Sequence, residues 1–384
     1  MTQPEADDVA LKFLHTADWH LGKRFPSFEK DDQLKLTRAR LEVLDAIFKL
    51  AHQHAVDAVF CAGDLFDEPS PDEDWWSGLV AKLAAAPGTF PIFLLPGNHD
   101  PLMPGSVYEA KHPFRRKLPA RVRVIDTDDF SCDLNELAVL YAKPCRSKSG
   151  QDDPAQALPA RAGGDSRIRI GMVHGSTFDA VNAQIAFPIA KDAAEKRGFN
   201  YLAIGDTHSF RCVPEGAIPP VVYPGAPEPT SFGEPGAGKV VLGFVSRSGR
   251  VRYDAHSVAA WTWRQETVRT MAELRLLHAE KLTRTVLRLV VDLRVTAPEL
   301  EEVDRLLKEL KGTSSLHARV GVLLLDRSAL RLDSRDIEKA LQDVPDVIRA
   351  AIQKLKAMEG TEDEDVARRA LYQLYQLVRE ARAS

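Results

Sequence analysis

The chain has 384 residues, of which 44% are hydrophobic and 28% charged, a composition typical of globular proteins. At roughly 100–200 residues per domain, this length predicts two or three domains. The formal net charge of −4 excludes a strong overall attraction to nucleic acid or to an anionic membrane. Binding to a phosphate backbone would therefore need local basic patches together with metal ions.

The cysteines and the first residues indicate the compartment. None of the four cysteines forms a Cys-x-x-Cys pair, which argues against structural zinc and against a disulfide framework. Residues 1–9 are polar and acidic, unlike a signal peptide, and no apolar run approaches the roughly 20 residues that cross a bilayer. We therefore expect a reduced, cytoplasmic protein without a membrane segment.

The first hundred residues alternate between short apolar runs and helical periodicity. Strands are predicted at 10–14, at 58–62 and from residue 91, and helices at 32–54 and 74–86. Strands that alternate with helices along a chain are typical of a parallel sheet.

The middle of the chain is richer in short strands. We expect strands at 122–125, 137–142, 167–173, 201–204, 221–223, 240–245 and 251–254, with a short helix at 192–198. Residues 147–165 are rich in glycine, proline, alanine and aspartate, and are predicted to form an exposed loop.

The composition changes after about residue 257, where glycine becomes rare. A strand at 285–295, a helix at 298–310 opened by the Thr296–Glu299 capping pattern, and a strand at 318–326 predict a small α+β domain. Helices at 346–358 and 364–381 either pack on their own domain or dock a partner through an apolar face. The expected division is 1–257, 258–345 and 346–384.

Residues of metal-binding type follow five of the predicted strands. They are Asp18 and His20, Asp64, Asn98 and His99, His174, and Asp206 and His208. In open α/β sheets, ligands bind beyond the carboxyl ends of the strands. Any one of these residues alone is explained as a turn residue, but five strand ends together predict a shared metal centre. Carboxylate, imidazole and amide ligands suit divalent manganese, iron or zinc, and a bridging carboxylate can hold two ions for phosphoryl displacement.

Other polar and aromatic residues near these positions receive structural interpretations. Asp67 and Asp100 are expected to orient the loops rather than bind metal, and His15 to pack at the strand exit. Trp75 and Trp76 are expected to pack on a helix rather than to stack on bases.

The segments around the ligand candidates resemble the ordered motifs of calcineurin-like metallophosphoesterases. The motifs are Leu14-His-Thr-Ala-Asp-Trp-His-Leu-Gly22, Gly63-Asp-Leu-Phe-Asp67, Gly97-Asn-His-Asp100, His174-Gly175 and Gly205-Asp-Thr-His208. The form of the first three is similar to that of SbcD-type DNA-repair nucleases. The resemblance covers about Leu11–Ser257 and implies a four-layered α-β-β-α sandwich. The later region fits only loosely the smaller capping domain of that branch.

The resemblance also implies a role for each site residue. One divalent ion would be held by Asp18, His20, Asp64 and His208, and the other by Asp64, Asn98, His174 and Asp206. His99 would donate a proton or stabilise the phosphoryl group while a hydroxide bridging the two metals attacks a phosphodiester. Where Asp206 stands, the family has histidine. We expect the second site to persist and to favour hard ions such as manganese, with iron, zinc and magnesium as alternatives.

Two basic segments bear on the substrate. Lys23 and Arg24 follow the first motif, and Arg115, Arg116 and Lys117 lie soon after the third; these residues either contact DNA phosphates or form solvated loops. The favoured function is a manganese-dependent DNA-repair nuclease, exonuclease or endonuclease. The alternatives are a phosphodiesterase or phosphatase for a small nucleotide or metabolite, and a subunit that mainly binds a partner. The resemblance further implies an SbcC-like coiled-coil ATPase partner and a homodimer.

Overall fold

The computed structural model describes residues 8–177, 186–312, 319–332, 344–358 and 360–383. The chain divides into two compact units, Met1–Trp261 and Thr262–Ser384, here called unit 1 and unit 2. Residues 1–7 of the acidic first stretch, and Ala318 of a predicted strand, lie outside the described residues. Across the ranges that the structure describes, no helix has both the length and the apolar character needed to cross a membrane.

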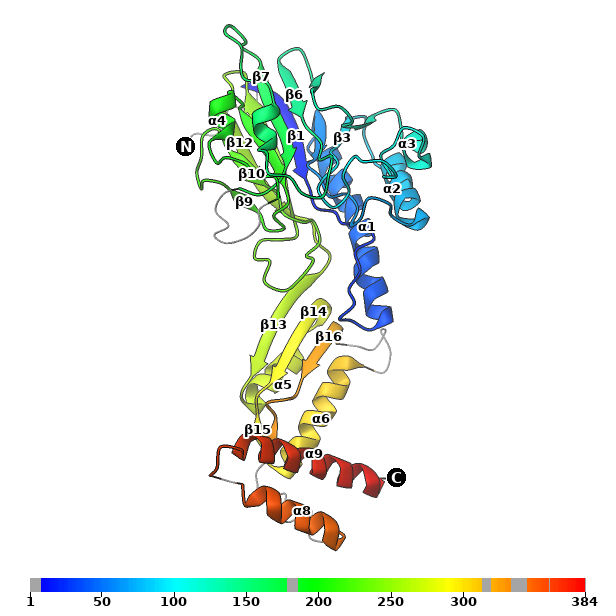
Figure 1. Ribbon diagram of the computed structural model, residues 1–384, viewed down its shortest axis with the longest axis vertical. Helices are drawn as coiled ribbons and strands as arrows, with labels where there is room; N and C mark the ends of the chain where they lie inside the picture. The colour runs from blue at the N-terminus through cyan, green and yellow to red at the C-terminus, as the bar shows by residue number, and fades with distance from the viewer. Residues whose placement is uncertain (1–7, 178–185, 313–318, 333–343, 359, 384) are drawn as a thin grey trace. The chain divides into compact units, whose positions relative to one another are not determined.

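Unit 1 is built on two six-stranded sheets (Figure 1). The first contains β1 (Val9–Thr16), β2 (Ala58–Cys61), β3 (Ile92–Leu94), β4 (Val122–Val124), β11 (Lys239–Ser246) and β12 (Val251–Ser257). The second contains β5 (Phe130–Asp133), β6 (Ala138–Ala142), β7 (Ile168–His174), β8 (Tyr201–Gly205), β9 (Arg211–Cys212) and β10 (Val221–Tyr223). Their strand orders are β12-β11-β1-β2-β3-β4 and β5-β6-β7-β8-β10-β9.

The strands that precede the ligand candidates are parallel neighbours. β1 pairs with β2, and β2 with β3, in the first sheet, while β7 pairs with β8 in the second. The parallel sheet predicted for the first hundred residues is therefore confirmed. Because parallel strands end at the same edge of their sheet, this pairing gathers the loops that follow them.

Helices cover the outer face of each sheet. They are α1 (Lys30–Gln53), α2 (Glu73–Ala85), α3 (Pro113–Lys117), α4 (Ala193–Arg197) and the 3₁₀ turn η2 (Pro154–Ala157). Ile47 of α1 packs in one cluster with Val59 of β2, and Phe13 of β1 packs between the sheets in one cluster with Ile170 of β7. On the far side of the second sheet, α4 and η2 share a cluster with β7 and β8. The four layers form the α-β-β-α sandwich that the resemblance implies.

Unit 2 has a parallel three-stranded sheet with helices. The sheet has the order β13 (Thr262–Val268), β14 (Leu282–Val291) and β16 (Val320–Asp326), and a short pair joins β15 (Arg294–Val295) to β17 (Arg331–Leu332). The helices are α5 (Met271–Ala279), α6 (Ala297–Lys311), α8 (Asp346–Lys356) and α9 (Glu364–Ala383).

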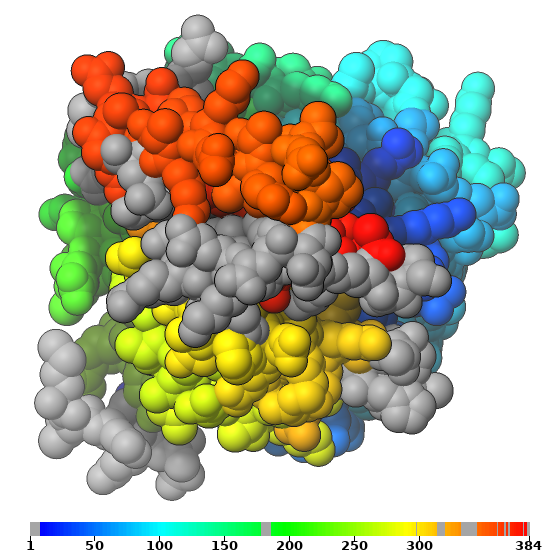
Figure 2. Space-filling view, turned by 90° about the horizontal axis from the view of Figure 1, so that it is seen from below, coloured from blue at the N-terminus to red at the C-terminus, as the bar shows by residue number. Residues whose placement is uncertain are grey.

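The C-terminal helices belong to the core of unit 2. One apolar cluster contains Leu289 of β14, Leu306 of α6, Ile352 of α8 and Tyr375 of α9. The two helices therefore pack on their own unit, the first of the two arrangements considered from the sequence. Part of α8 remains at the surface, where Figure 2 shows its atoms in orange and Val347 is 79% exposed.

Three elements differ from the expectation. The strand predicted at 285–295 is interrupted, because β14 ends at Val291 and β15 begins at Arg294. The predicted exposed loop 147–165 contains η2, and that part of the prediction is wrong: Ala155 and Leu158 are buried with α4 on the second sheet. Helix α5 is an addition that begins with a complete capping box of Thr270 and Glu273.

Candidate metal centre

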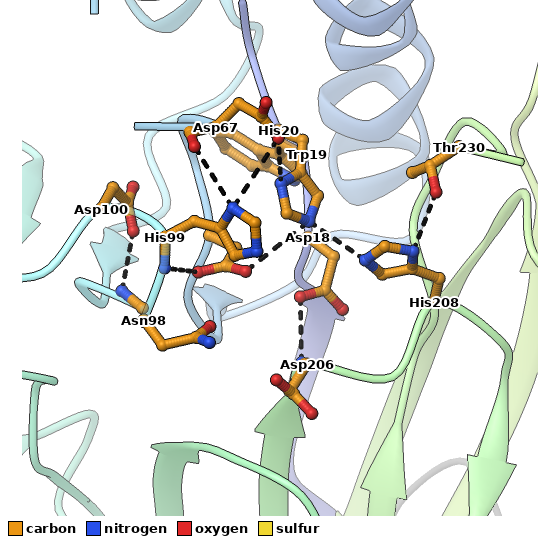
Figure 3. Close-up of polar contacts among 12 residues, drawn as sticks. Asp18, Trp19, His20, Asp67, Asn98, His99, Asp100, Asp206, His208 and Thr230 are labelled. Carbon is orange, nitrogen blue, oxygen red and sulfur yellow. Dashed lines mark hydrogen bonds and ion pairs between the residues drawn. The ribbon is translucent and has the colours of Figure 1, made fainter. Parts of the chain in front are cut away.

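The predicted ligands follow or end the strands β1, β2, β3, β7 and β8, and Figure 3 shows Asp18, His20, Asn98, Asp206 and His208 close together. Asp18 and His20 follow β1, Asp64 follows β2, Asn98 follows β3, His174 is the last residue of β7, and Asp206 and His208 follow β8. Backbone hydrogen bonds join the first two loops, because the N–H groups of Asp18 and His20 donate to the carbonyls of Gly63 and Asp64 at 3.0 and 2.9 Å. The two sheets are joined as well, since the Asp206 N–H donates to Asp18 Oδ1 at 2.9 Å.

Four of the predicted ligands have a left-handed backbone. The φ angle is 55° at Asp18, 45° at His20, 55° at Asp64 and 107° at Asp206. Residues with a side chain seldom adopt such angles, each at a cost of about 1–3 kcal/mol, and they persist where the surroundings impose them, often at functional sites. Four of them in one cluster, three from the first sheet and one from the second, indicate that the loops are held in shape for these side chains.

Two glycines allow the loops to approach closely. A Cβ atom on Gly97 would lie 2.1 Å from Asp64 Oδ1, and a Cβ atom on Gly63 would lie 2.1 Å from His174 Nδ1. Any larger residue would displace a ligand candidate. The absence of a side chain at Gly63 and Gly97 is therefore what lets these loops pack against the candidate ligands.

One half of the cluster gathers around His174. Its Nδ1 lies 2.8 Å from the Ala62 carbonyl, which can only accept a hydrogen bond, so Nδ1 carries a proton. Nε2 faces the other candidate metal ligands. Nε2 lies 2.9 Å from Asn98 Oδ1, 3.4 Å from Asp64 Oδ1 and 4.0 Å from Asp206 Oδ1. The Ser176 hydroxyl donates to the other oxygen of Asp206.

The other half is formed by His20 and His208, whose Nε2 atoms lie 3.1 Å apart. The remaining ring nitrogen of each faces a carboxylate: His20 Nδ1 is 3.0 Å from Asp67 Oδ1, and His208 Nδ1 is 2.9 Å from Glu234 Oε1. Carboxylates in this position fix the orientation of a metal-binding imidazole and raise its basicity. Asp67 thus orients a loop residue, as the sequence predicts.

Asp64 belongs to both halves. Its ligand atoms lie within 4.8 Å of those of Asp18 and His174 in one group, and of those of His20 and His99 in another. Asp18 Oδ2 is buried, and no donor of the described residues lies within hydrogen-bond distance of it. A buried carboxylate oxygen without a hydrogen-bond partner, close to imidazole and amide side chains that can also bind metal, suits a divalent cation. A carboxylate that belongs to two such groups suits two divalent cations.

The charges of the cluster also favour a cation. Burial raises the pKa of Asp18 to about 6. Burial acts in the same direction on Asp64, but the imidazole of His174 outweighs it and holds the pKa of Asp64 well below its usual range. Burial opposes a charge on His174, yet Asp64 beside it raises the pKa of His174 to about 10. The buried carboxylates therefore draw positive charge into the cluster.

His99 is the exposed member of the group. Its side chain is 44% exposed, whereas Asp18, His20 and His174 are buried. The backbone N–H of His99 donates to Asp64 Oδ1 at 2.9 Å. The ring Nδ1 lies 3.2 Å from the Asp67 carbonyl and donates to it, so Nε2 is the ring nitrogen that does not face Asp67. The ring lies perpendicular to that of His20 with 4.8 Å between centroids.

Asp100 connects the two loops that carry Asp64 and Asn98. Its Oδ1 accepts from the Gly97 N–H at 2.8 Å, and its Oδ2 accepts from the Phe66 N–H at 2.9 Å. Complete burial raises the pKa of Asp100 to about 8. These bonds agree with the expectation that Asp100 orients the loops.

The basic residues predicted to contact DNA are spread over two places. Lys23 lies beside the cluster, with Nζ 3.4 Å from Asp67 Oδ1, and Arg24 is exposed. Farther along, Arg115 pairs with Asp126 at 2.8 Å, Lys117 lies over the Trp76 ring at 5.1 Å, and Arg116 donates to the Lys111 carbonyl at 2.7 Å. The structure therefore brings only Lys23 of this set into contact with a residue that orients the cluster.

Sequence reasoning missed three residues that hold the cluster from behind. Glu234 and Thr230 contact His208 Nδ1, both at 2.9 Å, and Arg40 of α1 binds the backbone of Asp18. Burial opposes ionisation of Glu234, but its bonds to His208 and Thr230 lower its pKa to about 2. No spacing in the sequence indicates these contacts, since they join residues 22 to 26 positions apart in different elements.

A family model described as calcineurin-like phosphoesterase matches residues 11–210, more than half of the chain. The chain belongs to the calcineurin-like phosphoesterase family. The matched range includes every predicted metal ligand and His99. The family assignment made from the motifs is confirmed, and with it the fold, because the described layers are those that the resemblance implies.

Curated phosphoesterases of this family are similar to the chain over part of their length. The SbcD component of the SbcCD nuclease of Escherichia coli K12 is 28% identical over 275 residues, covering 60% of this chain and 64% of the relative. The SbcD protein of Rhodobacter capsulatus is 29% identical over 269 residues, covering 63% and 61%. The uncharacterized metallophosphoesterase YhaO of Bacillus subtilis is 26% identical over 271 residues, covering 67% and 63%. The chain thus spans less than two thirds of the length of each relative.

Proposed function

We propose that this phosphoesterase hydrolyses phosphodiester bonds of DNA with two divalent cations, manganese foremost. The observation that carries the proposal is the position of Asp64, which belongs to two groups of converging candidate ligands, one of which includes the exposed His99. The name of the nuclease relatives, and the position of Lys23 beside the cluster, favour DNA as the substrate.

The residues present would divide between two cations. Asp18, His20, Asp64 and His208 would hold one, and Asp64, Asn98, His174 and Asp206 the other. When bound, such a pair supplies a water of lowered pKa and positive charge beside the phosphoryl oxygens.

The chain's own residues would bind and orient around that pair. Asp67 and Glu234 hold the rings of His20 and His208 with Nε2 inward. His99 donates its Nδ1 proton to the Asp67 carbonyl, so in the imidazolium form of the ring the second proton is on Nε2, from which it can pass to the departing oxygen. No side chain has to form a covalent bond with the substrate.

A small nucleotide or other metabolite is the second candidate substrate. The observation that favours it is the engagement of the basic segment within the protein, where Arg115 pairs with Asp126 and Lys117 lies over Trp76. The net charge of −4 points the same way, because it provides no general attraction to DNA.

An assay with three substrates tests both candidates. Single-stranded DNA, duplex DNA and a chromogenic phosphodiester are each incubated with the chain and manganese, and with the matched variant Asp64→Asn, which keeps the side-chain shape but lacks the charge. We expect DNA cleavage that requires the metal and is lost in Asp64→Asn. Cleavage of the small diester alone would favour the second candidate, and no cleavage of any substrate would contradict both.

Partner, assembly and compartment are further parts of the proposal. We propose an SbcC-like coiled-coil ATPase as partner, a homodimer and a cytoplasmic location. The name of the nuclease relatives, which makes each of them one component of an SbcCD nuclease, supports the partner. A gene beside this one that encodes a P-loop and long heptad repeats would support it as well.

A further inference from the structure

Arg40 is a buried arginine behind the metal centre. It lies in α1, only 1% exposed, and none of the family motifs contains it. Five hydrogen bonds of its guanidinium run to backbone carbonyls of two separate loops. A buried charge is costly unless its geometry is well satisfied, so an arginine at this place needs a reason beyond filling the core.

Three of the five bonds hold the loop that carries two predicted ligands. The guanidinium donates to the carbonyls of Asp18, Trp19 and His20 at 3.2, 2.8 and 3.2 Å. Asp18 and His20 are two of the positions with a left-handed backbone. Arg40 therefore satisfies the carbonyls of a loop whose conformation is otherwise unfavourable.

The other two bonds hold the loop behind His208. The guanidinium donates to the carbonyls of Glu228 and Pro229 at 3.0 and 3.3 Å. The next residue, Thr230, contacts His208 Nδ1 at 2.9 Å and donates its hydroxyl to Glu234, which faces the same ring nitrogen. One side chain thus joins the loop of His20 to the loop that orients His208.

We propose that Arg40 is a positioning residue that sets the separation of the His20 and His208 imidazoles, and so the affinity of the one metal site that they share. The proposal rests on the proposed metal centre. The five bonds reach neither Asn98 nor His174, and Arg40 approaches the other site only through Asp18, so the effect on that site should be the smaller one.

The shape of the guanidinium explains why arginine serves here. Its five N–H groups lie in a fixed planar fork, whereas a lysine ammonium offers a single point of contact. Burial lowers the pKa of Arg40 to about 10, which still leaves it charged at neutral pH. A lysine would keep the charge but would not bridge both loops.

Arg169 provides a matched control. It is also a buried arginine, 2% exposed, in β7, where it pairs with Asp165 and lies over the rings of Tyr141 and Phe199. Removal of either guanidinium costs folding energy, but only that of Arg40 is bonded to the loops of the metal centre. A general loss of stability would appear in both variants.

The test is a manganese titration of metal-free protein by calorimetry, with electron paramagnetic resonance to count bound ions. Wild type is expected to bind two ions. In Arg40→Met we expect the Kd of the site of His20 and His208 to rise by about 10- to 100-fold, the range for residues behind metal ligands, and the other Kd to change much less. Arg169→Met should melt at a lower temperature and keep both Kd values. In a His208→Ala background, Arg40→Met should cause a smaller loss than it does in wild type.

The proposal is overturned if folded Arg40→Met binds both ions as wild type does, or if it weakens both sites equally. It is also overturned if Arg169→Met weakens the same site. Should Arg40→Met fail to fold, Arg40→Lys is titrated instead; the loss at one site is expected again, and binding like that of wild type would refute the role of the fork. A wild-type chain that binds fewer than two ions would refute the proposed metal centre itself, and this proposal with it.

Discussion

The two halves of the centre hold their imidazoles by different means. The Nδ1 atoms of His20 and His208 face the carboxylates of Asp67 and Glu234, at 3.0 and 2.9 Å. Behind His174 stands the neutral carbonyl of Ala62, at 2.8 Å.

The two halves differ in the charge of the group that faces the second ring nitrogen of each imidazole. A carboxylate behind a ring makes the imidazole a more basic ligand, whereas a carbonyl only fixes which nitrogen carries the proton. The half around His174 places a carboxylate, that of Asp206, among the direct donors, with Ser176 as its hydrogen-bond donor. Both halves have carboxylates among their candidate ligands, but the rings of His20 and His208, unlike that of His174, also have a carboxylate facing Nδ1.

The largest effect is expected from His99→Ala, because His99 is the exposed residue that contacts both the shared Asp64 and the ring of His20. Loss of the proton donor should lower turnover by about 10²- to 10⁴-fold while both metal ions remain bound. Steady-state kinetics and a metal count on the same preparation provide the measurement. Unchanged turnover would remove His99 from the mechanism, and loss of one ion would make it a ligand.

A smaller effect is expected from Glu234→Gln, which tests whether the negative charge of the carboxylate at His208 Nδ1 strengthens metal binding. Glutamine can still accept from His208 Nδ1 but has no charge, so manganese affinity at that half should fall by about 10- to 100-fold. The control is Ser176→Ala, which removes the neutral hydroxyl that donates to Asp206 in the other half. This variant should leave the manganese affinity of the site of His208 unchanged. Equal affinities of Glu234→Gln and wild type would show that only the hydrogen bond matters.

The smallest change in activity is expected from Asp206→His, which tests charge from the ligand itself. Replacing a carboxylate by an imidazole makes the second site softer and less negative, so its preference should move from manganese and magnesium toward zinc. Competitive metal titrations followed by activity in each metal measure the shift. If activity, metal affinity and metal preference all stayed the same, Asp206 would not be a ligand.

The predictable parts of this protein are those with a strong local signal. The strands that precede Asp18, Asp64 and Asn98 are short apolar runs, and the helix over 30–53 repeats its apolar residues at helical spacing. β5 and β13 were missed because their exposed residues interrupt any apolar run. Helix α5 was missed although the sequence contains its signal, the capping pair of Thr270 and Glu273.

The sequence by itself determined the family, the layered fold and the candidate ligands, because each of these is recorded in residues that lie near one another along the chain. Only the tertiary structure decided which residues form hydrogen bonds with the candidate ligands and with the loops that carry them. The contacts of Arg40 with Glu228, and of Glu234 with His208, join distant segments whose approach depends on how helix α1 and the loop after β10 pack around the sheet edge. Such contacts arise from packing of the whole unit, and no local pattern of residue types specifies them.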